Sequence, residues 1–286
     1  PVFALVNRPV IIDANYITFS GFHFINGKSI GVGREDLRGQ KVFNSTFRGT
    51  ISWDAIGTHG NDIVLAGNDC NVTNSSVGTQ GHCYYISHGS NLKLLYNVGR
   101  GAPGYGMHIF DHRRSANDCV RVISDVLVEG NLLAASPQRS GLIVAMGDED
   151  GIGNHVDGVT IRNNIFVANN FAGIAIGANV RNTKIYHNTF YQNGRQGITI
   201  YDEPSVNGVE ISNNLIDQSA NANCRLNCSW YQSAHIQNGA RAQNVTVTNN
   251  FYAPSAPILL SATDSAAASG APGFADAATA NFRLSA

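Results

Sequence analysis

Hydrophobic and polar residues alternate in short runs along most of the chain. The apolar side chains of Val159 and Ile161 point to one side of such a run, and the polar ones of Thr160 and Arg162 to the other, because side chains alternate along a β-strand. The run Ile174–Ile176 alternates in the same way. No helical period of apolar residues accompanies these runs, so the pattern predicts short β-strands.

The two-strand pattern recurs along the chain with an asparagine at a fixed place. From Asn164 to Asn188 is 24 residues, and from Asn188 to Asn214 is 26. A repeat of this length is typical of a β-solenoid, in which each copy buries its apolar residues only by stacking on its neighbours. The copies that carry the asparagine place it at Asn68, Asn97, Asn131, Asn164, Asn188, Asn214 and Asn250.

The repeated asparagines suggest both the shape of each coil and the number of coils. Asparagine tolerates the left-handed backbone conformation of a tight bend, and stacked asparagines can hydrogen-bond to one another as a ladder. Two further copies without the asparagine begin at Ile17 and Lys41, which gives about nine coils. We therefore predict an all-β chain with one parallel solenoid domain at residues 1–261 and an irregular C-terminal cap at residues 262–286.

The register of the second strand in each copy predicts which side chains face the solvent. One outward column contains Tyr85, His108, Ile143, Ala175, Thr199 and His235, and the next contains Ser87, Phe110, Ala145, Gly177, Tyr201 and Gln237. Tyr85 and His108 would then lie on adjacent strands about 4.8 Å apart. A long loop begins after this His108 strand, and long loops on a rigid β scaffold are where sites are usually built.

The composition favours a turn-rich β protein and disfavours several other classes. Charged residues make up 14% of the chain and hydrophobic ones 43%, with 30 glycines and a net charge of −1. This balance disfavours a disordered chain and a broad electrostatic field for nucleic acid or an anionic membrane. No apolar run is long enough for a membrane span. The chain begins with Pro1 rather than Met, which is compatible with a removed signal peptide, and we expect a monomer.

The five cysteines are an odd number, so at least one has no partner within the chain. Cys224 and Cys228 bracket a short loop and form either a disulfide, which would indicate an oxidising compartment, or a pair of free thiols. The remaining cysteines are Cys70, Cys83 and Cys119. Their surroundings do not match a zinc site.

The repeat resembles that of the right-handed parallel β-helix superfamily, which includes pectate lyases, alginate lyases and mannuronan epimerases. Segments 81–87 and 106–109 resemble a pattern common in secreted bacterial β-helix proteins, and segments 271–274 and 281–284 resemble the close of such domains. The resemblance covers almost the whole chain and implies a secreted or periplasmic enzyme that acts on an acidic polysaccharide. The chain matches no one family's full catalytic motif, so no residue set is transferred whole.

Lyases and epimerases of this superfamily remove the weakly acidic proton at C5 of a uronate. A cation against the substrate carboxylate stabilises the developing charge, a base takes the proton, and an acid helps the glycosidic oxygen to leave. Arg113 or Arg114 is the expected cation. His108 is the expected base and Tyr85 the acid, or the two exchange roles, and Asp111 would orient a histidine.

Further polar residues near this cluster, or on the same predicted face, are candidates for substrate binding. The candidates are His82, His88, Arg100, His112, Tyr201 and His235. Each of them is also compatible with an ordinary surface role.

Two other functions fit the same scaffold. A glycoside hydrolase needs two carboxylates, for which Asp111 together with Asp148, Glu149 or Asp150 are candidates. The acidic loop of Asp148, Glu149 and Asp150 is alternatively a site for Ca²⁺, although no metal site is firmly indicated. The third hypothesis is a non-catalytic solenoid that binds carbohydrate or serves in adhesion.

Overall fold

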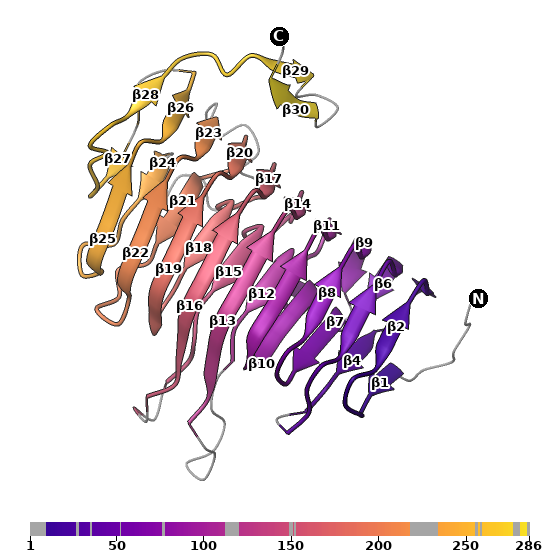
Figure 1. Cartoon of the computed structure of the whole chain (residues 1–286). Coiled ribbons are helices and arrows are strands. Elements are labelled where there is room, and N and C mark those ends of the chain that lie inside the picture. The colour runs from indigo at the N-terminus through magenta and orange to yellow at the C-terminus, as the bar shows by residue number, and fades with distance from the viewer. Residues whose placement is uncertain are drawn as a thin grey trace.

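The alternating runs form short strands that stack along one axis into a long solenoid (Figure 1). This computed structural model describes residues 10–26, 29–34, 36–51, 53–75, 78–111, 120–148, 151, 153–217, 234–254, 257, 259–276 and 281–284. The strands belong to three parallel sheets, A, B and C, with sheets B and C joined through the long strand β10. The prediction of an all-β, right-handed parallel β-helix is confirmed. Among the described residues, no helix has the length and apolar character needed to cross a membrane.

Each sheet takes one strand from every coil. Sheet A contains β3 (His23–Ile25), β6 (Thr46–Ile51), β9 (Asp69–Ser75), β11 (Val98–Arg100), β14 (Leu132–Ala134), β17 (Ile165–Val167), β20 (Thr189–Tyr191), β23 (Leu215–Asp217), β26 (Phe251–Ala253) and β28 (Ala268–Ser269). Sheet B contains β1 (Val10–Ile12), β4 (Ile30–Val32), β7 (Asp54–His59), the start of β10 (His82–Leu95), β12 (Met107–Ile109), β15 (Leu142–Val144), β18 (Ile174–Ile176), β21 (Gln196–Ile200), β24 (Ala234–Gln237) and β27 (Leu259–Leu260). Sheet C contains β2 (Thr18–Ser20), β5 (Lys41–Phe43), β8 (Val64–Ala66), the end of β10, β13 (Val122–Glu129), β16 (His155–Arg162), β19 (Val180–Tyr186), β22 (Asn207–Ser212) and β25 (Gln243–Thr248).

Most coils contain three strands, whereas the sequence pattern predicted two. The predicted first strand is divided by a bend at Asn163, whose φ is 57°. Residues before the bend belong to β16 in sheet C, and residues after it form β17 in sheet A. The buried positions change phase at the bend, from Val159 and Ile161 before it to Asn164 and Phe166 after it. The apolar but only half-buried Ile165 hides this change in the sequence pattern.

The asparagine ladder is present and lies inside the rod. Each ladder asparagine donates its side-chain N–H to the Oδ1 atom of the next one at 2.9–3.1 Å, from Asn68 to Asn250. All of them are buried. The expectation that these asparagines themselves adopt the left-handed conformation is wrong. That conformation belongs to the preceding residue, for example Asn163, Asn213 and Gly130, so that the ladder asparagine is free to turn its side chain inward.

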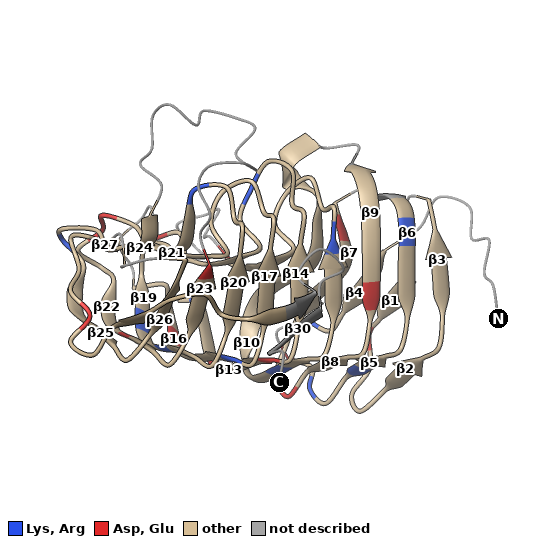
Figure 2. Cartoon of the chain, turned by 90° about the horizontal axis from the view of Figure 1, so that it is seen from above, with Lys and Arg blue, Asp and Glu red and all other residues tan. Residues whose placement is uncertain are grey.

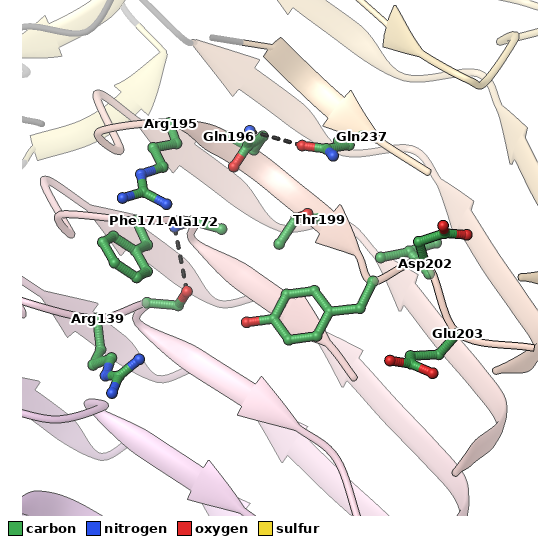
Figure 3. A pocket seen from close by; sticks show the side chains of 12 residues that line it. Arg139, Phe171, Ala172, Arg195, Gln196, Thr199, Asp202, Glu203 and Gln237 are labelled. Atoms are coloured by element: carbon green, nitrogen blue, oxygen red, sulfur yellow. Dashed lines mark hydrogen bonds between the residues drawn. The ribbon is translucent and has the colours of Figure 1, made fainter. Parts of the chain in front are cut away.

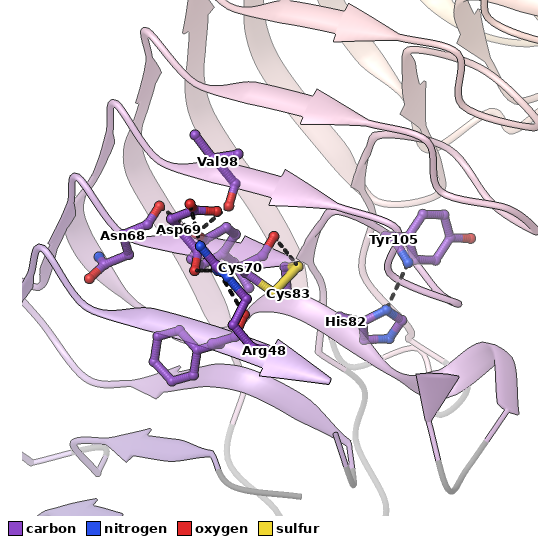
Figure 4. Close-up of a disulfide and its surroundings, with 10 residues drawn as sticks. Arg48, Asn68, Asp69, Cys70, His82, Cys83, Val98 and Tyr105 are labelled. Atoms are coloured by element: carbon purple, nitrogen blue, oxygen red, sulfur yellow. Dashed lines mark hydrogen bonds and ion pairs between the residues drawn. A yellow bond between two sulfur atoms is a disulfide. The ribbon is translucent and has the colours of Figure 1, made fainter. Parts of the chain in front are cut away.

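The interior of sheet A is a column of side chains that includes stacked phenylalanines. Phe24 stacks on Phe47 with ring centroids 4.8 Å apart, and Phe166 stacks on Phe190 at 5.0 Å. The same column contains Cys70, which forms a disulfide with Cys83 on β10 (Figure 4). The sequence did not reveal this pair, because the two cysteines come together only through the fold. Cys119, Cys224 and Cys228 lie outside the described residues.

The C-terminal tail closes the ladder and then folds back. The Asp264 carboxylate accepts the side-chain N–H of Asn250, the last ladder residue, at 2.9 Å. Strand β28 follows as a tenth strand of sheet A, and β29 (Phe274–Asp276) pairs with β30 (Asn281–Leu284) as an antiparallel hairpin. Phe274 meets the ring of Tyr191 edge-on at 5.9 Å. The hairpin therefore lies over an inner strand of sheet A rather than over the last coil (Figure 1).

Candidate functional site

Three adjoining cavities run along the outer face of sheet B. The N-terminal cavity has a volume of about 220 Å³, the central cavity about 550 Å³ and the C-terminal cavity about 460 Å³. The first two share Gln80, His82, His108 and Phe110 among their lining residues. The last two share Arg139, Tyr201 and Glu203. We call the three cavities together the groove.

The floor of the groove is the outward column of sheet B. Tyr85 pairs in register with His108, as the sequence predicted. The column continues through Ile143, Ala175, Thr199 and Gln237. The predicted place of His235 in this column is wrong, because Gln237 pairs with Thr199 instead. His235 is buried, and its Nε2 atom lies 3.1 Å from the carbonyl oxygen of Ala253 inside the rod.

A chain of hydrogen bonds fixes the proton positions of two histidines in the groove. The backbone N–H of Tyr105 donates to Nδ1 of His82 at 2.9 Å (Figure 4). A backbone N–H can only donate, so a neutral His82 carries its proton on Nε2. That atom lies 3.0 Å from Nδ1 of His108, which therefore accepts the bond. His108 in turn holds its own proton on Nε2, and it offers an N–H group rather than a lone pair to a bound molecule.

Both histidines are strongly biased towards the neutral form. Burial and, to a smaller extent, the positive charge of Arg139 together lower the pKa of His82 to about 3. Burial also lowers the pKa of His108 well below its usual value, with contributions from His82 and Arg139. The hydrogen-bond chain and the electrostatics thus agree that His108 is a neutral donor at neutral pH. This geometry does not fit the base role that the sequence suggested for it.

Arginine and aromatic side chains line one wall of the groove. Arg139, Phe171 and Arg195 each stand three residues before the first register position of their sheet B strand, on three successive coils. The Arg195 guanidinium carbon lies 3.7 Å from the centroid of the Phe171 ring, and that of Arg139 lies 5.8 Å from the Tyr105 ring. Charged residues are sparse along the rod (Figure 2), so two arginines in one wall are a distinctive feature.

The opposite wall is acidic. Asp202 and Glu203 follow β21 and face the arginine wall across Thr199 (Figure 3). Tyr201 lines both the central and the C-terminal cavity and is 40% exposed. The groove therefore presents cations on one side, carboxylates on the other, and aromatic rings between them.

Several predicted site residues lie away from the groove. Asp111 is buried in an ion pair with Arg121 at 3.0 Å, so it does not orient a histidine through this contact. His88 stacks on His59, with centroids 5.1 Å apart, and His59 lines a separate cavity. Arg100 ends β11 in sheet A, on a different face of the rod. His112, Arg113 and Arg114 lie outside the described residues.

The acidic loop proposed for hydrolysis or calcium binding is described only in part. The Asp148 carboxylate accepts the backbone N–H groups of Gly153 and Asn154 at 3.1–3.2 Å, so it stabilises its own loop. Glu149 and Asp150 lie outside the described residues. Among the described residues, no group of three or more His, Cys, Asp or Glu side chains is arranged to hold a metal ion. Ca²⁺ binding at this loop stays a prediction.

Sequence reasoning missed Asp54, Tyr105, Arg139 and Arg195. The repeat register does contain a signal for Arg139 and Arg195, because both precede a glycine at the same distance, in Arg139-Ser140-Gly141 and Arg195-Gln196-Gly197. Counting four residues towards the N-terminus from Ile143 and Thr199 in the outward column would have aligned them. The register contains a comparable signal for Asp54, which pairs with His82. It contains none for the contact of Tyr105 with His82, which is a hydrogen bond from the backbone N–H of Tyr105.

No protein-family model and no curated protein sequence matches the chain. Solved structures do match its fold. The alginate lyase from Paenibacillus sp. str. FPU-7 superimposes with a TM-score of 0.57 at 13% identity, over 88% of this chain and 95% of that one.

A tailspike protein of E. coli bacteriophage HK620, solved in complex with a pentasaccharide, gives a TM-score of 0.61 at 16% identity over 92% of this chain. The chain has the parallel β-helix fold of these proteins. It spans 45% of that tailspike chain and 42% of the chain in a second structure of the same protein, which gives a TM-score of 0.58 at 15% identity. At these identities the likeness concerns the fold alone.

Proposed function

We propose that this protein is a carbohydrate-active enzyme that binds an acidic polysaccharide along the groove and removes the C5 proton of a uronate residue. The observation that carries the proposal is the convergence of the His108 N–H, the Tyr85 phenol and the Arg139 guanidinium on the same face of sheet B. A cation and hydrogen-bond donors of this kind stabilise the negative charge that develops when a proton leaves the carbon next to a carboxylate.

The roles follow from the chemistry of each group. Arg139 has a permanent positive charge and neutralises the substrate carboxylate. The neutral His108 donates its Nε2–H to the same carboxylate as charge moves onto it in the transition state. Tyr85 gives its phenol proton to the glycosidic oxygen as that bond breaks. Cleavage makes the protein a lyase, and return of a proton to the other face of C5 makes it an epimerase.

The sugar would contact the groove mainly through hydroxyl groups and rings. Gln196 and Gln237 hydrogen-bond to each other at 2.9 Å and offer amide groups in the C-terminal cavity (Figure 3). Tyr201 and Trp53 are exposed aromatic side chains at the groove that can stack on sugar rings. We propose that the protein works in an oxidising compartment, secreted or periplasmic, because the buried Cys70–Cys83 disulfide persists there.

Incubation with a panel of acidic polysaccharides, followed by product analysis, tests the proposal. Ultraviolet absorbance from a new C4–C5 double bond identifies a lyase, and a changed uronate composition without cleavage identifies an epimerase. New reducing ends without that absorbance would indicate a hydrolase. Binding without any product would indicate a non-catalytic solenoid, and either of these two results would contradict the proposal.

A further inference from the structure

Asp54 lies in the groove one coil before Tyr85. It begins β7 and pairs in register with His82 on the next coil. Together with Tyr85 and His108 it lines the N-terminal cavity. The reacting groups of the proposed function and this carboxyl therefore face the same space.

The carboxyl group of Asp54 lies over the outward face of its own strand. Gly57 is the register partner of Tyr85 and belongs to the same outward column. A Cβ atom placed on Gly57 would lie 4.0 Å from Oδ2 of Asp54. Because Gly57 has no side chain, the space beside Tyr85 stays open, and the Asp54 carboxyl occupies its edge.

The surroundings of Asp54 make its carboxylate form a strong base. Its Oδ1 atom is buried and accepts no hydrogen bond from the protein. Burial raises the pKa of Asp54 to about 8, although the His82 backbone N–H lowers it in part. A desolvated carboxylate with few donors binds a proton more tightly than an exposed one. A base with a pKa near the working pH is also the most effective in proton transfer.

The proposed reaction needs such a group. His108 cannot take the C5 proton from its resting state, because its Nδ1 atom accepts the His82 bond and its Nε2 atom already carries a proton. Arg139 is permanently charged, and Tyr85 serves as the acid. We infer that Asp54 is the catalytic base that takes the C5 proton of the bound uronate. This inference rests on the proposed function.

The step balances without any further reactant. The Asp54 carboxylate takes the C5 proton, and the electron pair of the C5–H bond becomes the C4–C5 double bond. The C4–O bond breaks, its electron pair stays on the glycosidic oxygen, and that oxygen takes the phenol proton of Tyr85. Asp54 then holds a proton and Tyr85 is a phenolate, and transfer of that proton back to Tyr85 restores both groups.

The test compares two variants in two assays on a uronate polymer that the wild-type protein cleaves. Cleavage is followed by double-bond absorbance, and proton abstraction by deuterium exchange from solvent into C5, read by NMR. For Asp54→Asn we expect a loss of about 100-fold or more in both assays. For Tyr85→Phe we expect cleavage to be lost and exchange to remain. Asp36→Asn, a matched change beside the separate cavity, should behave as wild type.

Exchange in Asp54→Asn within a few-fold of the wild-type rate would overturn the inference. Wild-type protein that shows neither exchange nor cleavage on any uronate polymer would instead remove the proposed function. The pH dependence of the wild type gives an independent check that needs no folded variant. Its kcat/KM should rise with pH up to about 8, as Asp54 loses its proton, and a profile that is flat across this range would contradict the base role.

Discussion

The imidazole of His82 uses both of its nitrogen atoms within the protein, and this decides what its neighbour can do. One nitrogen accepts from the Tyr105 backbone and the other donates to His108. The first donor in this series of hydrogen bonds is the backbone N–H of Tyr105, which can only donate and never accept. Sequence reasoning placed His108 correctly beside Tyr85, but the direction of its hydrogen bonds depends on a turn that no residue pattern specifies. A single backbone group therefore converts a presumed base into a donor.

The donor role of His108 predicts which substitutions are tolerated. His108→Gln keeps an N–H group at this position, whereas His108→Ala removes it. We expect Gln to retain at least about 10-fold more kcat/KM than Ala, since one donor to a developing anion is worth about 10²–10³ in rate. Steady-state kinetics on the cleaved polymer measure the difference. Equal and complete inactivation of both variants would argue that His108 transfers a proton.

The lowered pKa of His82 predicts how stability depends on pH. In the unfolded chain His82 titrates near 6.5, and in the folded protein its pKa is about 3. Its contribution is complete above pH 6.5 and is lost as the pH falls towards 3, because the unfolded state then binds the extra proton. His82→Gln cannot titrate and keeps a donor. Urea unfolding between pH 7 and pH 4 should therefore show a steeper loss of stability for the wild type than for His82→Gln, by an amount on the order of 1 kcal/mol per pH unit.

At the scale of the element, the coil depends on two adjacent positions with opposite requirements. The first, such as Asn163, adopts the left-handed conformation and is exposed. The second, such as Asn164, is buried and bonds both along the ladder and to main-chain carbonyls. The sequence revealed the ladder because it repeats, but it did not reveal which of the two asparagines makes the bend. Asparagine tolerates the left-handed conformation at either position, so only the side-chain hydrogen bonds distinguish the two.

The same substitution at these two positions should have very different effects. Asn163→Gly should change the free energy of unfolding by less than about 0.5 kcal/mol, because glycine adopts positive φ readily. Asn164→Gly should cost about 3–5 kcal/mol, because it leaves buried groups of Asn131, Val128 and Asn188 without their partner. Chemical denaturation of both variants measures the difference. Similar losses at the two positions would mean that the ladder adds little to stability.

At the scale of the whole molecule, the groove follows the axis of the rod and crosses one strand per coil. Its lining residues extend from Trp53, directly before β7, and Asp54 in β7 to Gln237 on β24. The repeat was sufficient to predict the rod and the face, because it fixes which side chains point outward. It was not sufficient to predict the walls, since Arg139 and Glu203 stand in turns whose length varies from coil to coil. Prediction from sequence therefore works along the strands and fails at the turns between them.

The length of the groove predicts a preference for long substrates. Seven strands from β7 to β24 span roughly 29 Å at about 4.8 Å each, which is room for about six sugar units. The kcat/KM should therefore rise with chain length and level off near six units, as contacts remote from the cleaved bond add to transition-state binding. A series of defined oligosaccharides tests this. A plateau already at the disaccharide would show that the outer cavities do not bind the substrate.

The 24-residue period between Asn164 and Asn188 has a consequence for how such a protein can diversify. A gene that loses the codons for residues 165–188 would still encode strands that pair in register, because β16, β17 and β18 repeat the positions of β19, β20 and β21. That deletion would also bring Arg139 and Arg195 onto adjacent coils and remove Phe171 from between them. The spacing of the two guanidinium groups would shrink by about 4.8 Å. Loss of one coil by recombination can thus change the spacing of acidic groups that a polymer needs in order to bind in the groove. No point mutation is required.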